Sequence, residues 1–162
     1  MKSNSKKIGK KFEQDIEKSF PSMLCYERLK DSPNRYRKVH NPADYILFTG
    51  KLLLYLECKT VNSKRFPLKN ITIQQYAKML EKSVLVNTFG GYLIELRPIE
   101  ECYFIPVSEM SKWLSLNLYS EKSIPYEWIK EHGYKLGRQK KRTRYIYDIQ
   151  ALINYLEEAI IC

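Results

Sequence analysis

The sequence has 162 residues, of which 44% are hydrophobic and 13% aromatic, and its formal net charge at pH 7 is +10. This composition excludes an intrinsically disordered chain, and the length suits one domain that buries roughly 70% of its unfolded surface. No apolar run approaches the roughly 18 residues of a membrane span, so we expect a single domain over residues 1–162 with no membrane partner.

The cysteines and the N-terminal segment indicate a reducing compartment. The four cysteines form no Cys-x-x-Cys pair, and the two histidines complete no zinc pattern. We therefore expect free thiols at Cys25, Cys58, Cys102 and Cys162. The basic N-terminus has no apolar stretch behind it, so it does not resemble a signal peptide. We expect a cytoplasmic protein in which residues 1–7 form a disordered basic tail.

The first half of the chain alternates between one helical and several extended patterns. Apolar residues recur at four-residue spacing from Ile8 to Phe20, which predicts a helix over 6–20 that Pro21 ends. A short apolar run at 23–28 predicts a strand, and the polar, proline-containing stretch 30–42 reads as a loop. Two strands follow at 44–48 and 52–59, joined around Thr49-Gly50, and then a basic loop at 61–70.

The second half predicts a helix, two strands and three further helices. The predicted helices are 71–86, with Asn70 as a candidate N-terminal cap, then 108–116, 125–130 and 149–161. The predicted strands are 92–98, introduced by Gly90-Gly91, and 102–106, and a basic tip occupies 137–144. This order favours an α/β fold, with one mixed central β-sheet flanked by helices.

The stretch NPADYILFTGKLLLYLECKT, residues 41–60, combines a buried hairpin pattern with charged residues at its ends. Positions 45–56 are almost all apolar or turn-forming, whereas Asp44 precedes them and Glu57 and Lys59 end the stretch. Isolated charges at such places are expensive to bury. Glu57 and Lys59 are two residues apart on a strand, so their side chains point to the same face.

The hairpin geometry predicts where Asp44 lies relative to this pair. If Thr49-Gly50 forms a two-residue turn, Asp44 faces Tyr55 and becomes a diagonal neighbour of Glu57. A three-residue loop would reverse the parity and separate the two carboxylates. The competing interpretation is an ordinary surface salt bridge at the frayed end of a hairpin.

Two carboxylates and a lysine on one face favour a hard divalent cation. Mg²⁺ accepts carboxylate and carbonyl oxygens and is commonly shared with substrate phosphates. Asp44 and Glu57 would be its ligands, and the carbonyl of Cys58 could be a third. Lys59 could then orient or deprotonate an attacking water, or stabilise charge in the transition state.

The positive charge is clustered, which favours a polyanionic partner. Any one cluster could be a solvated face, but four clusters nearly free of acids in one small domain favour nucleic acid. The clusters comprise Lys2, Lys6, Lys7, Lys10 and Lys11; Arg28, Lys30, Arg35, Arg37 and Lys38; Lys59, Lys64, Arg65 and Lys69; and Lys135, Arg138, Lys140, Lys141, Arg142 and Arg144. None lies on a convincing amphipathic helix with an aromatic face, which disfavours a membrane surface.

The motifs and their order resemble a known nuclease family. PAD followed by ECK resembles the PD-(D/E)XK nuclease superfamily, and GKKFEQDI resembles the helix that opens Holliday junction resolvases. The stretch ECKTVNSKRFPLKNITIQQYAKML resembles the RecU family in particular, and GGYLIEL, CYFIPVSEM and KSIPYEWIKEHGYKL continue that similarity. It covers roughly residues 9–160 and implies a restriction-endonuclease-like core.

The resemblance also implies roles for individual residues. Asp44 and Glu57 would bind Mg²⁺, with Mn²⁺ as a possible substitute, and Lys59 would serve the attacking water. Glu13 would complete the acidic site from the first helix, and Gln75 would help to order it, although the adjacent Gln74 is also a candidate. Without the resemblance, Glu13 and Gln75 read equally well as ordinary polar helix positions.

The resemblance implies a metal-dependent endonuclease that hydrolyses branched DNA as a C2 homodimer. Longer RecU members carry a protruding stalk before the catalytic Asp, and the compact segment here leaves little room for one. Two alternatives therefore stay open: a nuclease that cuts ordinary duplex DNA, and a non-catalytic DNA-binding module. The phosphate contacts are expected from Lys10, Lys11, Arg28, Lys30, Arg35, Arg37, Lys38, Lys64, Arg65, Lys69, Arg138, Lys140, Lys141 and Arg142.

Overall fold

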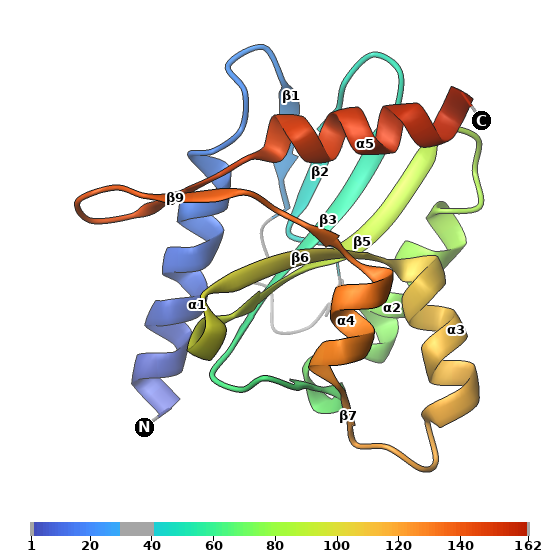
Figure 1. Cartoon of the computed structure of the whole chain (residues 1–162). Helices are drawn as coiled ribbons and strands as arrows, with labels where there is room; N and C mark the ends of the chain where they lie inside the picture. The colour runs from blue at the N-terminus through green and yellow to red at the C-terminus, as the bar shows by residue number, and fades with distance from the viewer. Residues whose placement is uncertain (1, 30–40, 162) are drawn as a thin grey trace, which may run out of the picture.

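A six-stranded mixed sheet forms the centre of the molecule in the computed structural model, which describes residues 2–29 and 41–161 (Figure 1). Its strands are β1 (Cys25–Arg28), β2 (Tyr45–Phe48), β3 (Leu53–Val61), β5 (Thr88–Leu96), β6 (Glu101–Pro106) and β8 (Tyr134–Lys135), in the spatial order β1-β2-β3-β5-β6-β8. Only β3 and β5 pair in parallel, and the helix between them makes the crossover that parallel strands need.

In the part of the chain that the structure describes, five α-helices and four minor strands complete the fold. The helices are α1 (Lys2–Glu17), α2 (Ile73–Lys82), α3 (Val107–Asn117), α4 (Tyr126–His132) and α5 (Ile149–Ile161). The minor strands are β4 (Phe66–Pro67) paired with β7 (Ser123–Ile124), and β9 (Arg138–Lys140) paired with β10 (Tyr145–Tyr147). Short 3-10 helices occupy Leu68–Asn70 and Arg97–Ile99. The predicted α/β class and mixed sheet are confirmed.

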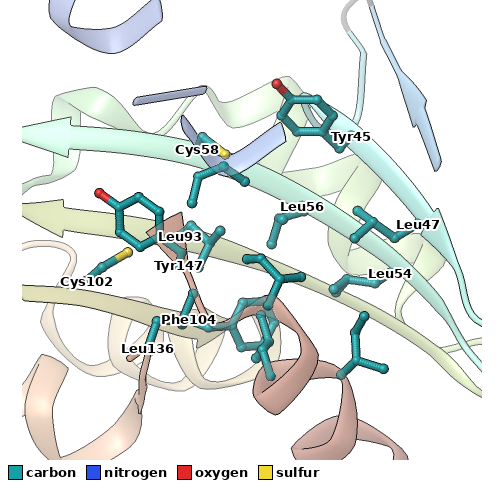
Figure 2. Packing of buried hydrophobic residues seen from close by; sticks show 14 of the residues in the cluster. Tyr45, Leu47, Leu54, Leu56, Cys58, Leu93, Cys102, Phe104, Leu136 and Tyr147 are labelled. Carbon is teal, nitrogen blue, oxygen red and sulfur yellow. The ribbon is translucent and has the colours of Figure 1, made fainter. Parts of the chain in front are cut away.

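Both faces of the sheet are covered, which explains why its central strands are apolar at nearly every position. On one face, Leu54 and Leu56 of β3 pack with side chains of α1 and α5, and Figure 2 shows part of this core. On the other face, Tyr55 of β3 packs in a cluster with Met79 of α2 and Trp113 of α3. The alternation along β3 also assigns Glu57 and Lys59 to the α2 side, because side chains two residues apart share a face.

The turn between β2 and β3 has four residues, so the prediction of a two-residue turn is wrong. The strands pair with Phe48 opposite Leu53, a shift of two residues from the predicted register. A shift by two preserves which side chains share a face, because the strand period is two. Continued by one step, the observed register places Asp44 directly opposite Glu57, closer than the predicted diagonal.

Helix boundaries differ from the predictions at two places. α1 begins at Lys2, where the sequence predicted a disordered tail over 1–7, since lysine and serine continue a helix at little cost once it has started. The prediction of Asn70 as the cap of the next helix is wrong, because Asn70 ends a 3-10 turn and Thr72 occupies the N-cap position. Apolar periodicity continues through that 3-10 turn, so the periodicity alone could not locate the boundary.

The predicted free thiols are confirmed at Cys25, Cys58 and Cys102, while Cys162 lies outside the described residues. Among residues 2–29 and 41–161, no helix is both long and apolar enough to cross a membrane. The predicted basic tip is a β-hairpin, β9–β10, whose loop projects past α1 (Figure 1).

Candidate active site

β3 continues beyond the end of β2, and this difference in length creates an open strand edge. The β2–β3 pairing ends with Tyr45 opposite Leu56, whereas β3 runs on to Val61. On its other side, β3 pairs with β5 along its whole length. The backbone groups on the open edge beyond Leu56 therefore need partners other than a strand.

Asp44 lies against this open edge. Its Oδ2 accepts a hydrogen bond from the Cys58 backbone N–H at 2.8 Å, and its own N–H donates to the Leu56 carbonyl at 3.1 Å. The N–H and C=O of one strand residue point to the same side, so the Cys58 carbonyl also faces this edge. The Cys58 thiol lies in the core on the α1–α5 face, where burial raises its pKa well above the usual range.

Glu57 is the most deeply buried charged side chain of the site, with 2% of the side chain exposed. Its Oε1 accepts a hydrogen bond from Lys59 Nζ at 2.6 Å. Its Oε2 faces Gln75 Nε2 on α2 at 3.4 Å, a long hydrogen bond, while the adjacent Gln74 is exposed. The structure thus brings together the predicted Glu57, Lys59 and Gln75 and distinguishes between the two glutamines.

Glu13 reaches the same region from α1, on the opposite side of the sheet edge. Arg28 of β1 holds it with a contact of 2.7 Å from its guanidinium to Glu13 Oε2, and makes a second contact of 3.2 Å to Glu17. The Tyr45 hydroxyl donates to the Glu13 backbone carbonyl at 3.1 Å. These contacts from β1 and β2 therefore fix the position of α1 relative to the open edge of β3.

The acids of the site perturb one another. Burial and the neighbouring Asp44 carboxylate raise the pKa of Glu57 from 4.5 to about 7, despite the adjacent ammonium of Lys59. Burial and Asp44 also raise the pKa of Glu13, with Arg28 opposing the rise. Burial alone would lower the pKa of Lys59, but Glu57 and Asp44 outweigh it and raise that pKa. Lys59 is consequently a protonated ammonium at neutral pH in the metal-free protein.

These groups line one cavity of about 670 Å³ that is open to solvent. Its walls come from α1, the end of β1, the segment before β2, β3 and the beginning of α2, five parts of the chain that are far apart in sequence. The lining residues are Lys10, Glu13, Arg28, Leu29, Asn41, Ala43, Asp44, Glu57, Lys59, Thr72 and Gln75.

The donor set fits a hard cation better than a closed metal cage. Within the described ranges, no group of three or more histidine, cysteine, aspartate and glutamate side chains is placed to hold an ion. Mg²⁺ does not need such a group, because it keeps several waters and usually takes one or two protein carboxylates. Asp44, Glu57 and the Cys58 carbonyl offer only oxygen atoms, and burial together with the Asp44 carboxylate raises the pKa of Glu57, so a bound cation would favour its ionised form.

The predicted DNA-binding cations fall into two groups in the structure. Arg28, Arg65 and Arg138 are engaged by acids of the protein itself, Arg65 with Glu121 at 3.0 Å. Exposed cations for which the structure shows no ion pair with a described acid are Lys10, Lys11, Lys64, Lys69, Lys140, Lys141 and Arg142. The predictions at Lys30, Arg35, Arg37 and Lys38 lie outside the described residues.

Three residues near the site were missed by the sequence reasoning. Thr72 and Asn41 line the cavity, and both lie outside any hydrophobic pattern, although Asn41 directly precedes the motif that contains Asp44. Tyr92 of β5 pairs with Glu57 across the sheet, and its hydroxyl is buried without a hydrogen-bond partner among the described atoms. An apolar strand pattern gives no signal for such a buried hydroxyl.

Comparison with solved structures shows the same fold. The structure of Archaeoglobus fulgidus Hjc, a Holliday junction resolvase from an archaeal hyperthermophile, superposes with a TM-score of 0.55 at 15% sequence identity. The alignment covers 78% of this chain and 95% of that one. A search of curated protein sequences returned no match.

Comparison with protein families adds the relationship that the fold alone cannot give. The family described as RecU, recombination protein U, matches residues 26–158, which include Asp44, Glu57, Lys59 and Gln75 but not Glu13. The match extends from β1 almost to the end of α5 and thus over most of the sheet and the whole open edge of β3. On this evidence, the chain belongs to the RecU family.

Proposed function

We propose that this protein is a divalent-metal-dependent endonuclease that cuts four-way DNA junctions. The observation that carries the proposal is the open edge of β3, where the buried carboxylate of Glu57 meets Asp44 and Lys59 in a cavity. Membership of the RecU family and the fold shared with a Holliday junction resolvase support the substrate.

In this proposal, Asp44, Glu57 and the Cys58 carbonyl hold Mg²⁺, which supplies electrostatic stabilisation to the charge that develops on the scissile phosphate. Lys59 Nζ lies 2.6 Å from Glu57 Oε1, where it orients the attacking water or stabilises negative charge on the phosphate. Gln75 keeps Glu57 in place through its amide. Glu13, steadied by Arg28, faces Asp44 from α1 and adds a further acid to the wall of the cavity.

The junction has two-fold symmetry, and paired cuts in opposing strands require two identical sites. We therefore propose a C2 homodimer as the active form. Exposed lysines beside the cavity, starting with Lys10, would hold phosphates and provide affinity without reading bases.

The test compares a labelled four-way junction with its linear arms, each incubated with Mg²⁺ and with EDTA. We expect paired nicks in the junction only, and only with metal. Asp44→Asn should bind the junction but cut it at least about 10³-fold more slowly, because the variant loses a charged group that contacts the reacting centre. Equal cutting of the linear arms would replace the junction proposal by duplex cleavage, and near-normal cutting by Asp44→Asn would refute the assigned site.

A further inference from the structure

The β9–β10 hairpin carries a dense group of cations. Its turn is closed by a hydrogen bond from the Lys141 N–H to the Arg144 carbonyl at 2.7 Å. Lys140, Lys141, Arg142 and Arg144 are all exposed, and no described acid forms an ion pair with any of them. Four unpaired cations within five residues repel one another, so an anionic partner would relieve a repulsion that the protein does not itself neutralise.

The base of the hairpin is held by acidic and aromatic side chains of the protein, whereas the cations at its tip form no ion pair with a described acid. The Arg138 guanidinium lies 4.1 Å from the ring centre of Tyr145, and it contacts Glu95 and Glu100, each at 3.5 Å. Glu95 is buried, and its Oε1 also accepts a hydrogen bond from the Tyr147 hydroxyl at 3.1 Å. Arg138 was predicted to contact phosphate, but its side chain is 11% exposed and is held by these acids. We assign it a positioning role instead.

The hairpin is also fastened to α1. The Tyr145 N–H donates to Asp15 Oδ2 of α1 at 3.2 Å, and the Tyr147 N–H donates to Ser19 Oγ, in the turn after α1, at 3.0 Å. The Tyr147 ring packs edge-on against Phe12 with 5.6 Å between ring centres. The orientation of the basic tip is therefore set by the helix that also forms a wall of the active site.

α1 presents cations on both of its sides. Lys10 lines the active-site cavity, whereas Lys11 lines a separate hollow of about 360 Å³ together with residues 140–145 of the hairpin. Consecutive residues on a helix point in directions about 100° apart, so adjacent lysines can serve two neighbouring depressions. Adjacent lysines of α1 thus line both the active-site cavity and the hollow beside the hairpin tip, and the hairpin loop projects past α1 (Figure 1).

We propose that the β9–β10 hairpin is a second DNA-binding element that grips the duplex arm leaving the active site. A two-stranded β-ribbon fits the major groove of B-DNA, and the cations at its tip would contact the phosphates that border the groove. Lys10, Lys11 and the cations of the tip are spread over two depressions, so an extended polyanion can contact all of them, whereas a single small anion would occupy only one depression. The inference rests on the proposed function only in taking DNA as the substrate.

The test neutralises the tip and measures binding without cleavage. We compare wild type with Lys141→Gln/Arg142→Gln by fluorescence anisotropy on a labelled linear duplex and on the junction, in EDTA, from 0.05 to 0.3 M salt. The slope of log affinity against log salt changes by about 0.9 for each phosphate contact, so losing two contacts should make it about 1.8 less steep. Over a tenfold rise in salt, the affinity of the variant should therefore fall roughly 60-fold less than that of wild type. The control Lys122→Gln/Lys130→Gln removes the same charge from two exposed positions, one directly before β7 and one in α4, and should leave the slope unchanged.

The outcomes separate this inference from the proposed function. If the tip variant keeps the wild-type slope, or if both double variants lower it equally, the hairpin is not a DNA-binding element, whatever the protein cleaves. If the slope of log affinity against log salt becomes less steep in the tip variant alone, the inference stands even if the protein does not cleave junctions. Thermal melting followed by circular dichroism checks that both double variants fold, and we expect little change because the substituted residues are exposed. Hydroxyl-radical footprinting should show that the tip variant no longer protects the duplex arm away from the cut.

Discussion

Replacing Glu57 by Gln should stabilise the metal-free protein at alkaline pH while it abolishes cleavage. Glu57 is buried beside Asp44, and these surroundings raise its pKa from 4.5 to about 7. Gln has nearly the shape of protonated Glu but cannot ionise. The substitution therefore removes the free-energy cost of ionising this carboxyl in the folded state.

The magnitude and its sign follow from proton linkage. The folded state binds the Glu57 proton more tightly than the unfolded state does, so the free energy of unfolding falls as pH rises from about 4.5 to about 7. Each pKa unit corresponds to about 1.4 kcal/mol, so the cost in wild type approaches roughly 3 kcal/mol at pH 8. The variant should match wild type near pH 4.5 and exceed its free energy of unfolding by up to this amount at pH 8.

Urea unfolding in EDTA at several pH values measures this difference. Glu131→Gln, which removes an exposed carboxylate of α4, controls for the change in net charge. Addition of Mg²⁺ should stabilise wild type and not Glu57→Gln, because only wild type keeps both carboxylates. A variant that is less stable than wild type at pH 8, or a difference that does not change with pH, would refute the assigned electrostatics.

Further predictions concern the stability of variants at four positions. Tyr92→Phe should be neutral or stabilising by about 1 kcal/mol, because it removes a hydroxyl with no described partner, whereas Tyr147→Phe, which breaks a hydrogen bond to a buried carboxylate, should cost about 1.5–3 kcal/mol in urea unfolding. Gly91→Ala should destabilise by about 1–3 kcal/mol or more in the same assay, because the added Cβ would lie 2.4 Å from the Phe104 ring. Glu101→Gln should make the free energy of unfolding less sensitive to acid. Burial alone would raise the pKa of Glu101, but hydrogen bonds from Lys135 and two tyrosines lower it to about 2, so the stabilisation from this carboxylate is lost in wild type between about pH 4.5 and pH 2 and is absent from the variant.

Local sequence patterns predicted the core of the site because its geometry is local. Glu57 and Lys59 share a face through the two-residue period of a strand, and this relation holds in any register. The juxtaposition of Asp44 and Glu57 survived an incorrect turn length, because the error was an even number of residues. The five helices and the strands β1, β2, β3, β5 and β6 followed from hydrophobic periodicity and from breaks at proline and glycine, whereas the short strands β4, β7, β8, β9 and β10 were not predicted.

What the sequence by itself determined about this protein is its α/β class, the carboxylate–lysine set of β3 and the excess of positive charge. Only the tertiary structure decided which cations are available, because Arg28 and Arg138 find their acidic partners on segments far away in the chain. The approach of Glu13 and Gln75 from helices on different faces of the sheet was equally invisible to spacing rules. Contacts of this kind depend on how the helices pack, and packing is set by the whole core rather than by the periodicity of any one segment.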